Sequence, residues 1–151
     1  MKKLRIYLDT SVIGGCFDEE FNFYSNKLFD YFYMGIYIPV ISDIIIAELQ
    51  NAPENIYKKI TSLDNVEIID SDEEMISLAK KYIEEDIVSD KWIDDALHIA
   101  IATVNKTDVL VSWNFKHIVN LNKINKFNSV NIKEGYHALE IRSPREIIED
   151  E

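Results

Sequence analysis

Short apolar runs alternate with amphipathic stretches along most of the chain. The mostly apolar runs that predict strands are residues 6–8, 36–40, 66–69, 109–111 and 130–132. Apolar residues at helical spacing predict helices over residues 23–34, 42–50, 54–63, 71–85 and 91–104. Strands that alternate with helices predict a three-layer α/β domain with a five-stranded, mostly parallel sheet.

Two helix starts carry further signals. Ser71 and Glu74 have the spacing of a capping box, so a helix is expected to begin at Ser71. Ser143, Pro144 and Glu146 combine a cap, a first-turn proline and a box partner, which predicts a last helix near the end of the chain.

Length and composition fit one domain over residues 1–151. The chain is long enough to bury a core, and 47% of its residues are apolar. The single cysteine, Cys16, excludes an internal disulfide. No signal peptide and no apolar run of about 18 residues is present, so we expect a soluble cytoplasmic protein that does not enter the membrane.

The net charge of -11 argues against broad, nonspecific binding to polyanions. One stretch departs from this acidic character, because residues 109–133 contain no Asp or Glu. The lysines of this stretch are Lys116, Lys123, Lys126 and Lys133. A coding bias toward Lys, Asn and Ile explains this asymmetry about as well as a function does.

Several acids are expected at one edge of the predicted sheet. Asp9 ends the first strand, and residues 112–114 follow the fourth. Glu48 lies in the helix after the second strand, while Asp94 and Asp95 begin the helix that leads into the fourth. Because ligands bind beyond the carboxyl ends of parallel strands, these side chains are candidates for a common site.

Clustered carboxylates without matching arginines repel one another, and a divalent cation removes that conflict. Oxygen ligands suit Mg²⁺ or Mn²⁺, which activate water and stabilise charge on a phosphodiester. The pattern therefore predicts metal-dependent phosphoryl hydrolysis. Each acid also has a structural explanation: Asp9 as a helix cap, Glu48 on a solvated helix face, and Asp94 or Asp95 at the positive end of a helix dipole.

Other chemistries fit the sequence less well. His98, His117 and His137 lack the spacing of a zinc site, and a single cysteine cannot complete one. His98 is expected to pack or to form hydrogen bonds on its helix. The sequence contains no phosphate-binding glycine loop and no nucleophile elbow.

Four blocks in order, YLDTSVIGG, ISDIIIAEL, DDALHIAIA and DVLVSWNFKHI, resemble the PIN-domain family, in particular VapC-like toxins. The resemblance runs from Leu4 to about Ile132. It implies a five-stranded parallel sheet flanked by helices, Mg²⁺- or Mn²⁺-dependent ribonuclease activity, and an antitoxin that blocks the site.

The resemblance also implies site residues. Asp9, supported by Thr10 or Ser11, is the first acid, Glu48 the second and Asp95 the third, with Asp94 as a neighbour only.

The fourth acid of many family members is replaced here by Asn114, whose carbonyl oxygen can bind a metal but adds no charge. Ser112 stands where the family has a hydroxyl residue near the metal.

Two functional hypotheses follow. The first is a metal-dependent endoribonuclease, the toxin of a type II toxin–antitoxin pair, in which Asn114 joins the three acids as a ligand and Ser112, Lys116 and His117 contact the RNA. The second is a PIN-like module that lost catalysis and binds RNA or protein. Aromatic residues in 21–35 suit a homodimer face or an antitoxin groove, and a core helix explains them nearly as well.

Overall fold

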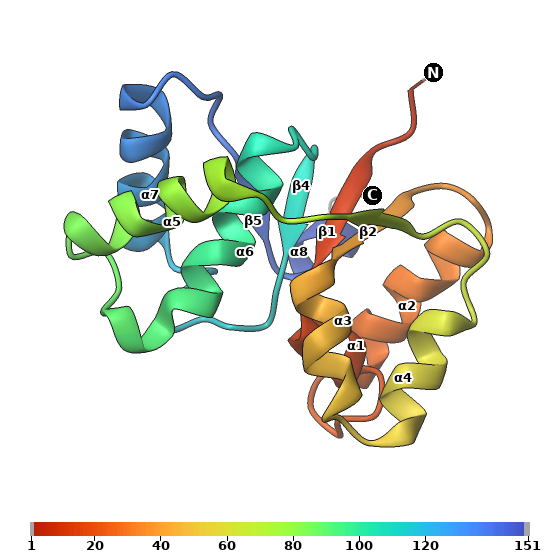
Figure 1. The fold of residues 1–151 in the computed structure, drawn as a ribbon. Helices are drawn as coiled ribbons and strands as arrows, with labels where there is room; N and C mark the ends of the chain where they lie inside the picture. Colours follow the sequence, from red (N-terminus) through yellow and green to blue (C-terminus); the bar gives the residue numbers. More distant parts are fainter. Residues whose placement is uncertain (1, 150–151) are drawn as a thin grey trace.

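The computed structural model describes residues 2–149, and its centre is a five-stranded sheet in the order β3-β2-β1-β4-β5 with every neighbouring pair parallel (Figure 1). The strands are β1 (Arg5–Leu8), β2 (Ile38–Ser42), β3 (Glu67–Ile69), β4 (Val109–Val111) and β5 (Glu140–Arg142). The predicted α/β class with a parallel sheet is thus confirmed.

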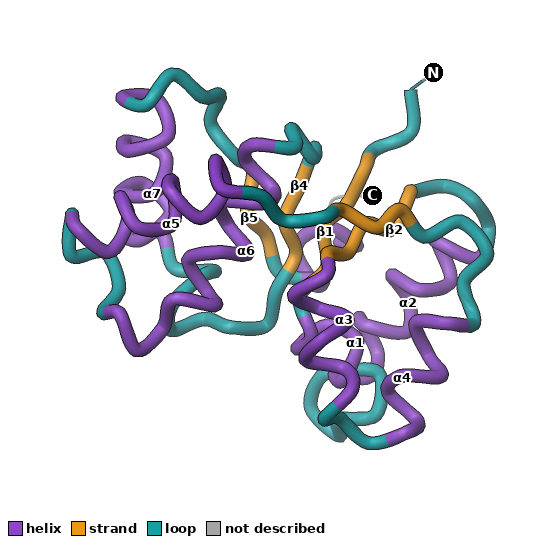
Figure 2. Tube along the Cα trace, viewed as in Figure 1, coloured by secondary structure: helices purple, strands orange, loops and turns teal. Residues whose placement is uncertain are grey.

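Helices cover the sheet on two sides. On one side lie α1 (Thr10–Gly15), α2 (Asn22–Tyr33), α3 (Asp43–Gln50) and α4 (Glu54–Thr61). On the other lie α5 (Glu73–Glu84), the short 3₁₀ helix η1 (Asp90–Trp92), α6 (Ile93–Val104) and α7 (Leu121–Lys133). The chain ends in α8 (Pro144–Glu149), which packs against α2. Figure 2 shows the strands in orange between these two groups of purple helices.

Burial of the strands and helices accounts for the short, continuous apolar runs in the sequence. Ile6, Tyr7 and Leu8 are all fully buried, as expected for a parallel strand covered on both faces. In α6 every residue from Ala96 to Thr103 is buried, so this helix lies between the sheet and α5 with little solvent contact. The core therefore fixes β1, β4 and α6 relative to one another.

The predicted fifth strand is wrong. Residues 130–132 belong to α7, whose buried residues Phe127, Val130 and Asn131 recur at helical spacing. Asn120 caps this helix by accepting a hydrogen bond from the Lys123 amide at 3.2 Å. Packing of one apolar face thus overrides the strand preference of valine and isoleucine, and β5 lies eight residues further along.

Of the two helix starts predicted from capping signals, one is shifted and one is confirmed. The helix expected to begin at Ser71 begins at Glu73, because its cap is Asp72, whose carboxylate accepts from the Met75 amide at 2.9 Å. The Ser71 hydroxyl instead donates to Asp43. The capping box before α8 is confirmed, since Ser143 and Glu146 each accept the other's backbone amide hydrogen bond.

No helix among the described residues is long and apolar enough to cross a membrane.

Candidate active site

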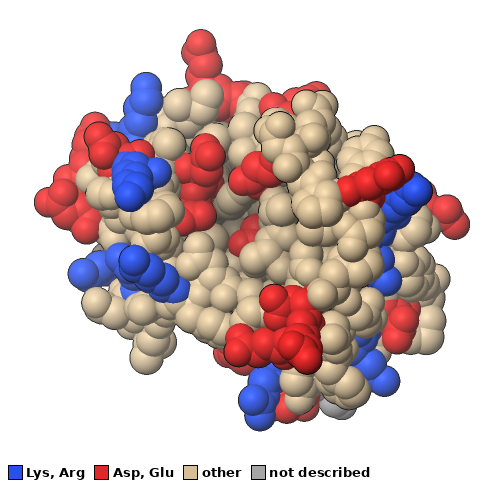
Figure 3. All heavy atoms as spheres, turned by 90° about the horizontal axis from the view of Figure 1, so that it is seen from below, with Lys and Arg blue, Asp and Glu red and all other residues tan. Residues whose placement is uncertain are grey.

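The candidate residues meet where the order of successive strands in the sheet reverses. The chain leaves β1 toward β2 and leaves β4 toward β5, so β1 and β4 flank a topological switch point, where open α/β sheets bind ligands. Asp9 follows β1 directly, and Ser112 follows β4. Figure 3 views the molecule from the side to which these strands run in Figure 1, and acidic side chains surround a hollow on that face.

Asp9 is held by three hydrogen bonds and is only 6% exposed. Its Oδ1 accepts from the Ser11 hydroxyl at 2.6 Å and, as the cap of α1, from the Val12 amide at 3.3 Å. Its Oδ2 accepts from the Ser112 hydroxyl at 2.5 Å. Burial raises the pKa of this carboxyl, although the two serine hydroxyls oppose the shift. The capping explanation is therefore correct, but it accounts for only one of the three contacts.

Glu48 reaches the same region from α3. Its Oε1 accepts from the Thr10 hydroxyl at 2.7 Å and lies 3.3 Å from Nε2 of His98. Burial alone would raise the pKa of Glu48, but the hydrogen bond and the charge of His98, followed by the bond from Thr10, lower it. Glu48 is thus no freely solvated helix residue.

His98 is a site residue that sequence reasoning missed. It is buried, and its Nδ1 lies 2.8 Å from the Tyr7 hydroxyl, which in turn lies 2.8 Å from the Ser42 hydroxyl. Burial disfavours the charged imidazole, but Glu48, then Asp9 and Asp95, raise the pKa of His98. Of the two expectations for His98, packing is confirmed by its burial, while its hydrogen-bond partners, Tyr7 and Glu48, lie on other elements and not on its own helix. The available signal was a polar residue on the buried face of an apolar helix.

Asp95 enters from the first turn of α6, and its partners follow β4. Its Oδ2 lies 2.9 Å from Nδ1 of His117 and accepts a long 3.4 Å hydrogen bond from Nδ2 of Asn114. The neighbouring Asp94 is exposed.

Asn114 directs its two amide atoms to different partners. Its Oδ1 accepts from the backbone amides of Lys116 and His117, at 3.2 and 2.9 Å, and this closes the turn after β4. Its Nδ2 is the atom that faces Asp95. The carbonyl oxygen expected to bind a metal is therefore already used by the turn.

A continuous set of contacts joins the two sides of the site. The Ser112 hydroxyl donates to Asp9 and accepts from the Asn114 amide at 2.9 Å. Asn114 in turn contacts Asp95. The charges of Glu48, Asp9 and Asp95 each raise the pKa of His98, so all three carboxylates lie within electrostatic range of this imidazole.

Two carboxylate oxygens of the site have no hydrogen-bond partner within the part of the chain that the structure describes. Among residues 2–149, no hydrogen bond reaches Oε2 of Glu48 or Oδ1 of Asp95, and no Lys or Arg forms an ion pair with Asp9, Glu48 or Asp95. Within the same residues, no group of three Cys, His, Asp or Glu side chains is spaced to hold a metal ion. The donor chemistry fits a hard cation, and the present spacing would have to tighten to bind one.

The other residues that were predicted to contact RNA differ in their exposure to solvent. Lys116 is exposed, whereas His117 is buried, bonded to Asp95 and packed against Trp92 with ring centroids 4.5 Å apart. Trp113 packs in the core: it stacks on Phe21, and its indole N–H donates to Ser25.

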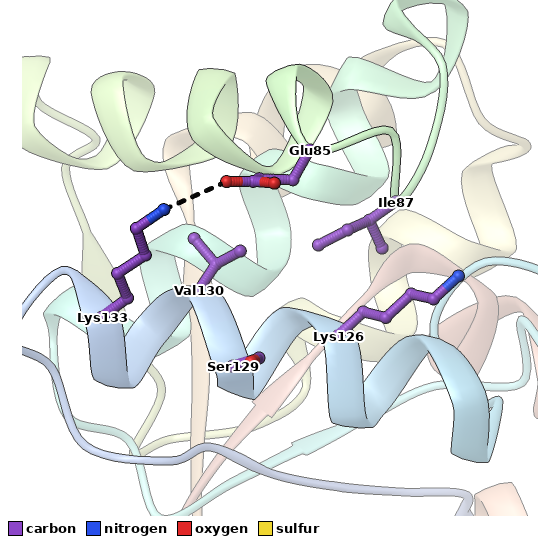
Figure 4. Close-up of a pocket in the computed structure, with 6 residues that line it drawn as sticks. All are labelled: Glu85, Ile87, Lys126, Ser129, Val130 and Lys133. Carbon is purple, nitrogen blue, oxygen red and sulfur yellow. Dashed lines mark hydrogen bonds and ion pairs between the residues drawn. The ribbon is translucent and has the colours of Figure 1, made fainter.

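A separate cleft of about 320 Å³ lies between α5 and α7 (Figure 4). Lys133 forms an ion pair with Glu85 across it, Lys126 lines its other end, and Ile87 and Val130 lie between them. Because Glu85 contributes a negative charge and none of the candidate residues line it, this cleft is not part of the site.

Solved toxin structures share this architecture. A chain of VapBC2 from Rickettsia felis, solved with a promoter DNA fragment, matches with a TM-score of 0.58 and 20% identity, covering 93% of this chain and 98% of that one. VapC20 from Mycobacterium tuberculosis, a toxin that cleaves the sarcin–ricin loop, gives 0.57 and 12% identity, covering 74% and 92%. A chain of FitAcB from Neisseria gonorrhoeae gives 0.56 and 14%, covering 92% and 97%.

The chain therefore has a VapC-like PIN-domain fold, as the sequence resemblance implied. Comparison with protein-family models and with curated proteins finds no match. At these identities the likeness concerns the fold, and function has to be argued from the site.

Proposed function

We propose that this protein is a metal-dependent endoribonuclease and the toxin of a type II toxin–antitoxin pair, with Asp9, Glu48 and Asp95 as ligands of Mg²⁺ or Mn²⁺. The observation that carries the proposal is the gathering of three carboxylates at the switch point without a Lys or Arg partner. Such a group is costly unless a cation joins it.

The residues have separate roles in this proposal. A bound cation would supply an activated water and stabilise charge on the phosphodiester. Asp9 is oriented by its serine hydroxyls, while Glu48 and Asp95 offer the oxygens Oε2 and Oδ1, which accept no hydrogen bond from residues 2–149.

The role of Asn114 in this proposal differs from the sequence expectation. We assign it to positioning, because its carbonyl oxygen closes the turn and its NH₂ group faces Asp95. Ligation through the carbonyl oxygen would require this turn to open.

Substrate contacts are proposed for three residues. Lys116 is exposed beside the site and suits an RNA phosphate. Ser112 is fully buried and already bonded to Asp9, so its effect on substrate would be exerted through that carboxylate. His117 is proposed to act in the same indirect way, by holding Asp95.

The test uses purified protein and a panel of RNAs. We expect cleavage with Mn²⁺ or Mg²⁺, no cleavage with EDTA, and no cleavage by Asp95→Asn. The matched control is Asp94→Asn, which removes the same charge from the neighbouring exposed position and should cleave normally. Cleavage that survives both EDTA and Asp95→Asn would overturn the proposal.

Two partners are part of the proposal. The structural match to a toxin–antitoxin complex from Klebsiella pneumoniae supports an antitoxin, which should inhibit cleavage when the product of an adjacent small reading frame is added. Exposed Phe23 and Met34 at the ends of α2 favour a homodimer, for which light scattering should give twice the chain mass.

A second function is favoured by Asn114. A module that binds RNA or protein without catalysis needs no fourth acid, and the carbonyl oxygen used by the turn fits that function. Calorimetric titration with Mn²⁺ separates the two: no binding at millimolar metal favours the module, and binding that Asp95→Asn abolishes favours the enzyme.

A further inference from the structure

The two tryptophans of the chain have different surroundings. Trp113 is buried and stacks on Phe21. Trp92, the last residue of η1, is 36% exposed and is not among the described side chains that pack on the core. Part of the Trp92 indole is therefore accessible to a ligand, and its surroundings indicate which ligand it suits.

Three side chains surround the Trp92 ring. His117 packs against it with ring centroids 4.5 Å apart at 42°. The ammonium groups of Lys91 and Lys116 lie 5.1 and 5.9 Å from the ring centroid. An exposed aromatic ring with two cations is the combination with which proteins bind single-stranded nucleic acid: the base stacks and the cations contact phosphates.

This aromatic ring is close to the candidate acids. Trp92 contacts His117, and His117 lies 2.9 Å from the Asp95 carboxylate. A base stacked on Trp92 is thus one side chain away from Asp95, and its phosphate would lie near the hollow. Two residues before and two residues after Trp92 in the sequence, Asp90 and Asp94 are exposed and repel phosphate. Stacking on Trp92 therefore has to contribute much of the affinity for RNA.

We propose that Trp92, Lys91 and Lys116 form a binding platform for one nucleotide of single-stranded RNA next to the cleavage site. The proposal rests on the ribonuclease function and adds a substrate contact to it. Because every base has an aromatic face, the platform holds the strand without selecting its sequence.

Binding is measured without catalysis, by fluorescence anisotropy of a labelled single-stranded oligoribonucleotide in EDTA. We expect Trp92→Ala to weaken binding about tenfold and Trp92→Phe, which keeps an aromatic face, to weaken it far less. Tyr57→Ala is the matched control, since Tyr57 is an exposed aromatic residue on α4, across the sheet. It should bind like the unchanged protein.

The lysines are tested by salt dependence. Lys91→Gln and Lys116→Gln should each lower the slope of log affinity against log salt by about 0.7, the value for one phosphate contact with a single strand. In cleavage assays Trp92→Ala should raise KM with little change in kcat, because it removes binding and leaves the acids in place.

The outcomes separate this proposal from the ribonuclease function. Equal oligonucleotide affinity for Trp92→Ala and the unchanged protein overturns the platform, even if metal-dependent cleavage is found. Loss of affinity in Trp92→Ala but not in Tyr57→Ala supports the platform, even if no cleavage occurs and the ribonuclease function fails. Calorimetry with Mn²⁺ should be unaffected by Trp92→Ala, and a loss of metal binding there would overturn the substrate role.

Discussion

The two sides of the candidate site are held in different ways. On the first side, Asp9 follows a core strand and caps α1, and Glu48 is tied to Thr10 and to the buried His98. On the second side, Asp95 lies at a helix start, and its two partners, Asn114 and His117, come from the loop after β4. The first side is therefore part of the folded core, while the second depends on a loop.

This difference indicates which side of the site contributes more to stability and which contributes more to ligand binding. The hydrogen bonds that orient Asp9 also cap α1 and join the end of β1 to the end of β4. A substitution of Asp9 is therefore expected to affect the fold. Within residues 2–149, the hydrogen bonds of Asp95 all use one oxygen, Oδ2, and leave Oδ1 without one. Substitutions on the second side should therefore alter ligand binding more than folding.

The largest expected effect is that of Asp9→Ala on stability. Loss of the cap costs about 1 kcal/mol, and two hydroxyls that lose their acceptor raise the loss in unfolding free energy to about 3 kcal/mol. Asp95→Ala, which removes the contact with His117 and the long 3.4 Å bond from Asn114, should cost about 1 kcal/mol. Urea denaturation without metal measures both. Equal losses would mean that the two sides do not differ in the way described.

The next effect is on metal binding. Asp95→Asn keeps the shape of the side chain and should leave the melting temperature without metal nearly unchanged. It should weaken Mn²⁺ binding by more than about a hundredfold, because even outer-shell substitutions cost up to that much. Melting curves with and without Mn²⁺ report this as a lost stabilisation. Asp94→Asn should keep the stabilisation, and an equal loss there would point to net charge as the cause.

A smaller effect is expected from the residue that joins the two sides. Ser112→Ala removes the donor to Asp9 and the acceptor of the Asn114 amide, which should cost about 1–2 kcal/mol of unfolding free energy. It should also weaken Mn²⁺ binding, since both sides lose their common contact. Exposed Ser129 on α7 provides the control, and Ser129→Ala should change neither quantity. Unchanged metal binding in Ser112→Ala would show that the two sides act independently.

The sequence predicted the fold class well because the strands β1 to β4 lie in short, mostly apolar runs between helices of clear period, whereas β5 contains one apolar residue only. It failed at residues 130–132, where valine and isoleucine favour a strand locally, but Val130 packs on the buried face of α7 with Phe127 while Ile132 is exposed. This outcome depends on contacts with residues distant in sequence, which a local pattern does not contain.

The sequence predicted which side chains of the candidate site converge, but it did not predict which of their atoms make the contacts. Strand ends and the family blocks located Asp9, Glu48 and Asp95. The contact between His98 and Glu48 joins two helices and has no local signature. Likewise, nothing in the sequence shows that the carbonyl oxygen of Asn114 closes a turn while its NH₂ group faces Asp95.

The smallest expected effect, and the most informative about the second side, is that of Asn114→Asp. The new carboxylate can still accept from the backbone amides of Lys116 and His117, so the turn should persist. Without metal, the second negative charge beside Asp95 should lower the unfolding free energy by up to about 1 kcal/mol.

With Mn²⁺ the sign of the Asn114→Asp effect should reverse. An added carboxylate near the cation strengthens binding, and calorimetry should show an affinity a few-fold higher. The reversal requires position 114 to face the metal, so it tests that position directly. Unchanged affinity would mean that residue 114 serves the turn alone, and that the loop contributes to the site only through the bond between His117 and Asp95.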